Sequence, residues 1–312
     1  MFNQIEKIMP KKKFRILLLV IVITASAFTY FFYNYSLDIS GMYKIGKDEL
    51  LSSANIYNKP VVYIGVISRY PPNIIYRGYQ PVLDYLSQKT NYRFELKLSS
   101  DYNEAVQMLI KKETAAAFLG SYVYVNAHKQ YGVIPILKPL NEDFEPYSRS
   151  VLITNKSSKL FSVKDLKGKR LALPSKESFS GNWLIKYEFA KYNLRVPDIA
   201  DIQHFPHHQS VIYQVSKGYF DAGVTREFLV KNMQNNDRIR IILYSDKIPT
   251  SPIVVAQDHD KEIVEAIKNT LLEINPSNPD RVEITKNWDN EFIYGFEQAS
   301  DSDYEFIRMI SE

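Results

Sequence analysis

Short apolar runs alternate with amphipathic stretches along the chain from about residue 60 onward. The run at 61–67, VVYIGVI, is rich in β-branched residues and is bounded by prolines, which is typical of a strand. At 79–90, apolar residues recur at helical spacing. The same pattern then predicts a strand at 93–98, a helix at 102–112 and a strand at 115–119. This alternation with short loops predicts an open α/β sheet.

A second set of α/β elements follows the apolar run at 150–154. Its predicted members are helices at 163–166, 182–192 and 209–217 and strands at 170–174, near 202, at 222–225, at 240–244 and at 253–256. Helices predicted at 261–274 and 301–310 return to the first set. We therefore expect two lobes with a double crossing, in which residues 60–150 plus 251–312 form lobe 1 and residues 151–250 form lobe 2.

The N-terminal part has a different pattern, a nearly uncharged run at 14–35. It has roughly the ~20 residues that cross a bilayer, and the basic cluster KKKFR before it places the N-terminus in the cytoplasm. This predicts a cytoplasmic tail at 1–13, a single transmembrane anchor at 14–35, a linker at 36–59 and an extracytoplasmic C-terminal domain on the cell membrane. A cleaved signal peptide with Ala25-Ser26-Ala27 as its cleavage site is the alternative, and it also exports the domain.

Composition and charge narrow the function classes. The chain has 312 residues and a formal charge of +4, and the first fifteen residues alone account for +4 (five Lys or Arg against Glu6). The remainder nets zero, so no nucleic-acid partner is indicated. The absence of cysteine excludes disulfides, a thiol nucleophile and a lipid-modified N-terminal cysteine.

The segment 174–182, PSKESFSGN, lies between a predicted strand and a predicted helix. Small hydroxyl residues and a glycine at a helix start leave backbone N–H groups free to hold a phosphate-like anion. The alternative is that Ser178 or Ser180 caps its own helix.

Three histidines, His204, His207 and His208, stand just before the predicted helix at 209–217. A metal site is one interpretation, but cysteine is absent and adjacent histidines rarely aim at one ion. We favour a histidine that faces a ligand or caps the helix, and we expect no metal and no cofactor.

At 119–127 a predicted strand ends and runs through Gly120 into a helix start. Ligands of open α/β sheets lie at the carboxyl ends of strands, so Ser121, Tyr122 and Tyr124 are candidates for ligand contact, although packing explains them equally well. The sequence contains no G-x-S-x-G, P-loop or H-E-x-x-H motif, and we therefore expect a binding protein and not an enzyme.

Several motifs follow one another in a fixed order from about Val61 to Ile310. They are Tyr79-Gln-Pro-Val-Leu-Asp-Tyr-Leu86, Asp101-Tyr102, Leu119-Gly-Ser-Tyr-Val-Tyr124, Asp165-Leu-Lys-Gly-Lys-Arg-Leu-Ala172, Ser178-Phe-Ser-Gly181, the His208–Gly218 helix with Asp221-Ala-Gly223, and Ile248-Pro-Thr-Ser-Pro-Ile-Val-Val255. Taken together, the chain resembles the phosphate/phosphite/phosphonate-binding class of ABC-transporter substrate-binding proteins. The resemblance implies a two-lobed α/β fold of the type II periplasmic-binding-protein kind.

The resemblance also implies a site. Carried over by motif, Ser178, Ser180, Gly181, Tyr124 and His208 would clasp a tetrahedral anion. In this chain the S-T-S-G motif reads SFSG, which removes one hydroxyl donor, and Ser121 stands where the family has proline. Glu227 is the candidate for contact with an aminoalkyl group.

The resemblance predicts an extracytoplasmic binding protein that closes its lobes on phosphate, phosphite or a phosphonate for an ABC permease. The membrane anchor makes a ligand-sensing ectodomain for a signalling partner the first alternative. A different solute, such as a metal complex, a pyrimidine precursor or an amino acid, is the second.

Overall fold

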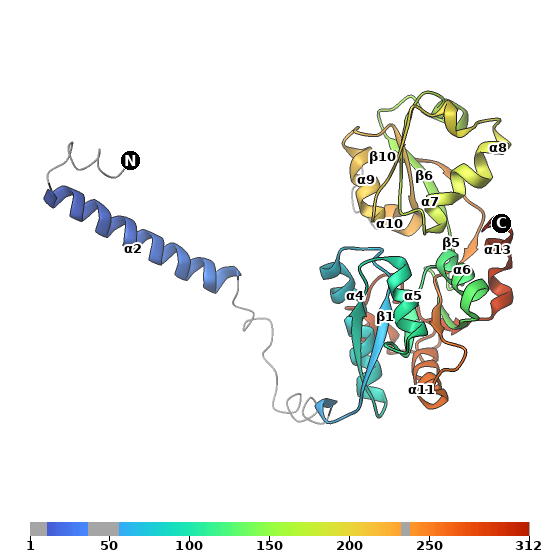
Figure 1. Cartoon of the computed structure of the whole chain (residues 1–312), viewed down its shortest axis with the longest axis horizontal. Coiled ribbons are helices and arrows are strands. Elements are labelled where there is room, and N and C mark those ends of the chain that lie inside the picture. Colours follow the sequence, from blue (N-terminus) through green and yellow to red (C-terminus); the bar gives the residue numbers. More distant parts are fainter. Residues whose placement is uncertain (1–10, 37–55, 232–237, 312) are drawn as a thin grey trace. The chain divides into compact units, whose positions relative to one another are not determined.

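The computed structural model describes residues 11–36, 56–231 and 238–311 (Figure 1). The chain divides into two compact units, Met1–Asn55 and Ile56–Glu312. Most of the predicted basic tail and of the predicted linker lies outside the described residues.

The first unit contains the helix α2 (Lys11–Ser36). Its segment Lys12–Tyr30 is long and apolar enough to cross a membrane, with a mean hydropathy of 1.7. The hydroxyl of Thr24 donates to the carbonyl of Val20, one turn earlier, at 2.9 Å, so this polar group is satisfied inside the helix. Length and composition suit a membrane anchor or a signal sequence.

The second unit begins with a six-stranded sheet in the order β13-β4-β12-β3-β1-β2. β1 runs parallel to β2 and β3, and β12 runs antiparallel to β3 and β4. The strands are β1 (Val61–Val66), β2 (Arg93–Leu98), β3 (Ala116–Phe118), β4 (Ile134–Pro139), β12 (Ile253–Val255) and β13 (Phe296–Gln298). The helices in these parts of the chain are α4 (Pro72–Lys89), α5 (Tyr102–Ile110), α6 (Ser121–Tyr131), α11 (Lys261–Leu272), α12 (Arg281–Thr285), the 3-10 turn η5 (Asp301–Tyr304) and α13 (Glu305–Ser311).

Helix α4 begins seven residues before the predicted start at 79. Pro72 occupies its first turn, where a missing N–H costs nothing, and Pro81 lies inside it. A Cβ on Gly78 would approach the Cβ of Asp289 to 2.9 Å, and the carbonyl of Gly78 accepts the N–H of Asp289 at 2.8 Å. This close approach packs the segment that carries Glu291 against α4.

A five-stranded sheet in the order β10-β6-β9-β7-β8 forms the other half. Its strands are β6 (Ser150–Asn155), β7 (Arg170–Leu173), β8 (Asp201–His204), β9 (Ala222–Arg226) and β10 (Ile239–Tyr244). Its helical elements are η2 (Val163–Leu166), α7 (Phe179–Trp183), the π-helical η3 (Leu184–Glu188), α8 (Phe189–Lys191), η4 (Val196–Asp198), α9 (His208–Ser216) and α10 (Glu227–Lys231).

The chain passes between the two sheets beside a short antiparallel pair, β5 (Tyr147–Ser148) with β11 (Ile248–Pro249). Figure 1 shows the two sheets as separate halves with these crossing segments between them. Two mixed sheets with helices between their strands, connected by a double crossing, confirm the predicted two-lobed α/β fold.

Each half has its own apolar core, and a further cluster spans both. In that cluster Tyr122 and Ile307 from the first half join Phe179, Trp183 and Leu184 from the second. Tyr187 also packs edge-on against Phe306. Apolar contact therefore contributes to holding the two halves together.

Candidate functional site

A cleft lies between the two halves, with residues from both in its wall. The lining residues are Ile67, Arg69, Tyr102, Gly120, Ser121, Tyr122, Val123, Ser148, Arg149, Ser150, Glu177, Ser178, Phe179, Ser180, His208, Arg226, Ile248 and Ser251.

Four helices begin at this cleft. The first residues of α5, α6 and α9 and the N-cap of α7 are among the lining residues. The first N–H groups of a helix have no partner inside the helix and carry partial positive charge. Four such termini around one cleft favour an anion as its occupant.

The SFSG segment forms the start of α7. Ser178 is its N-cap: its hydroxyl accepts the N–H of Gly181 at 3.1 Å and donates to the carbonyl of Ser175 at 2.8 Å. A Cβ at position 181 would lie 2.0 Å from that carbonyl oxygen, so only glycine fits. Ser180 is buried, and its hydroxyl lies 2.7 Å from that of Ser150. Ser178 thus caps its helix and lines the cleft at once.

His208 is the first residue of α9 and is only 4% exposed. Its Nδ1 atom has no hydrogen-bond partner among the described residues. Burial, then the charges of Arg226 and Arg69, hold the pKa of His208 well below its usual value, so the ring is neutral at neutral pH. The imidazole of His204 instead bonds the carbonyl of Pro174 at 2.7 Å and supports the loop before α7.

Two arginines of the cleft wall share one carboxylate, which lies behind them and does not line the cleft. Arg69 Nη1 lies 3.0 Å and Arg226 Nη2 lies 2.9 Å from Oε1 of Glu291. Tyr79 donates to Oε2 at 3.1 Å, and Arg69 also donates to Ser251 at 3.0 Å. Burial alone would raise the pKa of Glu291, but Arg226 and Arg69 outweigh it and lower that pKa to about 2. The cluster therefore carries two positive charges against one negative.

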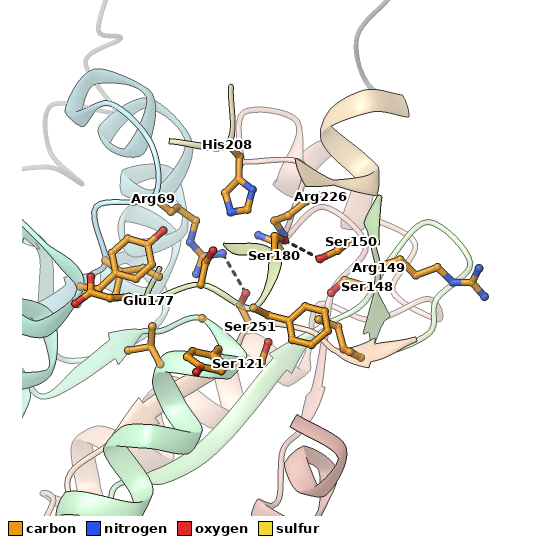
Figure 2. Close-up of a pocket in the computed structure, with 18 residues that line it drawn as sticks. Arg69, Ser121, Ser148, Arg149, Ser150, Glu177, Ser180, His208, Arg226 and Ser251 are labelled. Atoms are coloured by element: carbon orange, nitrogen blue, oxygen red, sulfur yellow. Dashed lines mark hydrogen bonds between the residues drawn. The ribbon is translucent and has the colours of Figure 1, made fainter. Parts of the chain in front are cut away.

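Figure 2 shows His208 between Arg69 and Arg226, with Ser180 and Ser150 close to Arg226. Hydroxyl, N–H and guanidinium donors thus face one small space. Such a donor set can satisfy the oxygens of a tetrahedral anion.

Of the seven residues predicted from sequence, Ser121, Ser178, Ser180 and His208 line the cleft, and Gly181 shapes it from behind. Tyr124 lies outside it: its hydroxyl donates to Asp301 at 2.5 Å, and Tyr122 lines the cleft instead.

Glu227 lines a second cavity, where it pairs with Lys231 at 2.9 Å. In the described part of the chain, no three His, Asp or Glu side chains come together to hold a metal ion.

Sequence reasoning did not find Arg69, Arg226, Glu291, Ser150 or Ser251. Arg69 follows β1 and Arg226 ends β9, so a search for charged residues at the carboxyl ends of strands would have found both. Glu291 lies in a loop with no sequence signal of its own.

The second unit of the chain resembles a known protein family. The family model for the periplasmic substrate-binding protein of phosphonate ABC transporters matches residues 64–304. A binding protein of an ABC phosphonate transporter from Pseudomonas aeruginosa superposes with a TM-score of 0.70 at 20% identity, over 81% of this chain and 86% of that one.

PhnD1 from Prochlorococcus marinus in complex with methylphosphonate gives a TM-score of 0.69 at 19% identity, over 81% of this chain and 97% of that one. A Xanthomonas citri protein bound to ATP superposes with a TM-score of 0.64 at 17% identity, over 81% of this chain and 96% of that one. At these identities the structural likeness shows a shared fold.

Proposed function

The chain belongs to the family of periplasmic substrate-binding proteins of phosphonate ABC transporters, and from this premise we propose that its cleft binds a small phosphorus oxyanion for uptake through an ABC permease. Phosphate, phosphite and phosphonates share the tetrahedral, oxygen-rich group that this role requires.

The observation that carries the proposal is the donor set of the cleft. Four helix N-termini, the buried side chains of Ser180 and His208, and two guanidinium groups meet there. A buried hydrogen-bond donor without an acceptor costs free energy. An anion with several acceptor oxygens removes this cost because it accepts hydrogen bonds from such donors. In this proposal Ser178, Ser180 and His208 form the clasp, with Ser121 opposite them.

Closure of two lobes supplies the binding signal. We propose lobe 1 as residues 60–150 plus 251–312 and lobe 2 as residues 151–250, with the β5–β11 pair as the hinge. Cleft contacts come from both lobes, so an anion held between them favours the closed form, which the permease recognises.

A double substitution tests the clasp. Ser180→Ala with His208→Ala should abolish the thermal stabilisation that phosphate, phosphite or methylphosphonate gives the full chain in detergent. In the wild-type chain, a ligand present at ~100 times its Kd raises the free energy of unfolding by about 2.7 kcal/mol. The matched control is Ser157→Ala with His259→Ala, which removes the same groups outside the cleft. Retained stabilisation in a folded double variant would contradict the site, and the absence of a shift with every oxyanion would contradict the function.

The helix α2 favours a second role. An uncleaved apolar helix would tether the domain to the membrane, as a ligand-sensing ectodomain for a membrane signalling partner requires. Genes for a permease and an ATPase beside this one support transport, whereas genes for a kinase or cyclase support sensing.

A further inference from the structure

The cleft contains more buried positive than negative charge. Arg69 is 3% exposed and Arg226 is 9% exposed, and both line the cleft. Arg69 follows β1 of the six-stranded sheet, and Arg226 ends β9 of the five-stranded sheet. Their shared partner Glu291 is 7% exposed and does not line the cleft. Two positive charges less one negative leave +1 in this cluster.

The carboxylate of Glu291 has little capacity left. It accepts hydrogen bonds from Arg69, Arg226 and the hydroxyl of Tyr79. The Nε atom of Arg69 is buried and has no partner among the described residues, so the unmet demand in the cluster is for an acceptor.

Among the described residues that line the cleft, Glu177 is the one carboxylate. It accepts the N–H of Tyr102 at the start of α5. Burial and then Asp101 raise the pKa of Glu177, and the residue is exposed, unlike Arg69 and Arg226. Figure 2 places its side chain across the cleft from Arg226.

We infer that the ligand is an oxyanion whose substituent carries no positive charge, and that Arg69 and Arg226 determine this selectivity. The inference rests on the proposed function and narrows it. A cationic substituent beside Arg69 and Arg226 would meet two buried guanidinium groups whose shared carboxylate, on Glu291, is already engaged. Aminoalkylphosphonates are therefore poor ligands, whereas alkylphosphonates, phosphite and phosphate are accepted.

Two ligands of nearly equal size separate charge from shape. Propylphosphonate and 2-aminoethylphosphonate differ by a terminal methyl in place of an ammonium group. We would measure both by calorimetry on the full chain in detergent at about pH 8, where a primary ammonium with a pKa of ~10.4 keeps its charge. We expect the amino compound to bind at least about tenfold more weakly, since like charges repel strongly at low dielectric.

Substitutions at Arg226 then test the cause. Arg226→Gln should bring the ratio of the two Kd values close to one, whereas Arg226→Lys keeps the charge and should keep the ratio. Arg77→Gln is the control, because it removes one charge from an exposed position on α4. Thermal melts verify that each variant is folded. The ratio of the two Kd values in the wild type tests the inference even if a variant fails to fold.

Equal or tighter binding of 2-aminoethylphosphonate by the wild type would overturn the inference and leave the proposed function standing. An unchanged ratio in folded Arg226→Gln would overturn the role of Arg226. Binding of neither phosphonate, nor of phosphate or phosphite, would overturn the proposed function and the inference with it.

Discussion

At the scale of single residues, Glu291 connects the architecture to the site. Its carboxylate neutralises one of two buried guanidinium groups that come from opposite sides of the cleft. A buried charge that loses its partner is strongly destabilising, because neither water nor a counter-charge compensates it. Glu291 is therefore a structural requirement for having Arg69 and Arg226 in the cleft at all.

The first prediction concerns Glu291→Gln. This change should lower the free energy of unfolding by about 3–5 kcal/mol, measured by urea denaturation. Glu297→Gln is the control: Glu297 pairs with Lys138 at 3.1 Å but its side chain is 42% exposed, so the loss should stay below about 1 kcal/mol. Similar losses of stability in Glu291→Gln and Glu297→Gln would show that the two buried arginines do not depend on the carboxylate of Glu291.

The second prediction is a pH dependence. The pKa of Glu291 is about 2 in the folded protein against 4.5 as its ordinary value, so the unfolded chain binds the proton more readily. The stabilisation is fully present above pH 4.5 and declines as the pH falls from there toward 2. The stability difference between wild type and Glu291→Gln should therefore shrink over this window. A constant difference down to pH 3 would contradict the assignment.

At the scale of elements, the start of α7 depends on one close backbone approach. Gly181→Ala would place a Cβ 2.0 Å from the carbonyl oxygen of Ser175, so the loop before the helix must move. We expect a stability loss of ~1–3 kcal/mol or more together with much weaker anion binding, measured by melting and calorimetry. Gly120→Ala is the comparison for stability, because its Cβ would meet Ile67 at 3.5 Å, an ordinary contact. Unimpaired oxyanion binding by Gly181→Ala would remove α7 from the site.

The alternation of apolar runs was enough to predict the two lobes and most elements, because periodicity reports burial within an element. The start of α4 was wrong by seven residues, since Pro72 and Pro81 resemble helix breakers in a sequence. The SFSG helix start was found by its local chemistry. Whether Ser178 binds a ligand stays a prediction, because its capping role is satisfied by the structure in any case.

The arginine cluster could not be predicted, for a physical reason. Arg69 and Glu291 are 222 positions apart, and Arg226 lies 65 positions from Glu291. Their contact depends on how both sheets and the loop beside α4 are placed, which no local pattern encodes. Tyr124 illustrates the converse: its motif position suggested a ligand contact, but its hydroxyl is engaged by Asp301.

At the scale of the whole molecule, contacts between the halves occur on more than one side of the cleft. Lys186 reaches the hydroxyl of Tyr122 at 3.1 Å, and Lys231 pairs with Glu142 at 2.6 Å. The lysine pairs are partly exposed and contribute little each, whereas the apolar cluster around Trp183 and Ile307 is buried. Apolar contact therefore contributes more than these lysine pairs to the contact between the halves.

The last prediction separates the two units of the chain. All residues that line the cleft belong to the second unit, from Ile67 to Ser251, so binding should not need α2. A chain without residues 1–55 should be recovered in the aqueous fraction and should bind methylphosphonate with a Kd within about twofold of the full chain, a difference below ~0.5 kcal/mol.

The full chain should instead remain with membranes after an alkaline wash, unless Leu18 and Ile21 are both replaced by arginine, which costs about 2.5–3.5 kcal/mol per residue at the centre of an inserted helix. Loss of binding in the shortened but folded chain would mean that the first unit takes part in the site, and a mature N-terminus after Ala27 would identify α2 as a signal sequence.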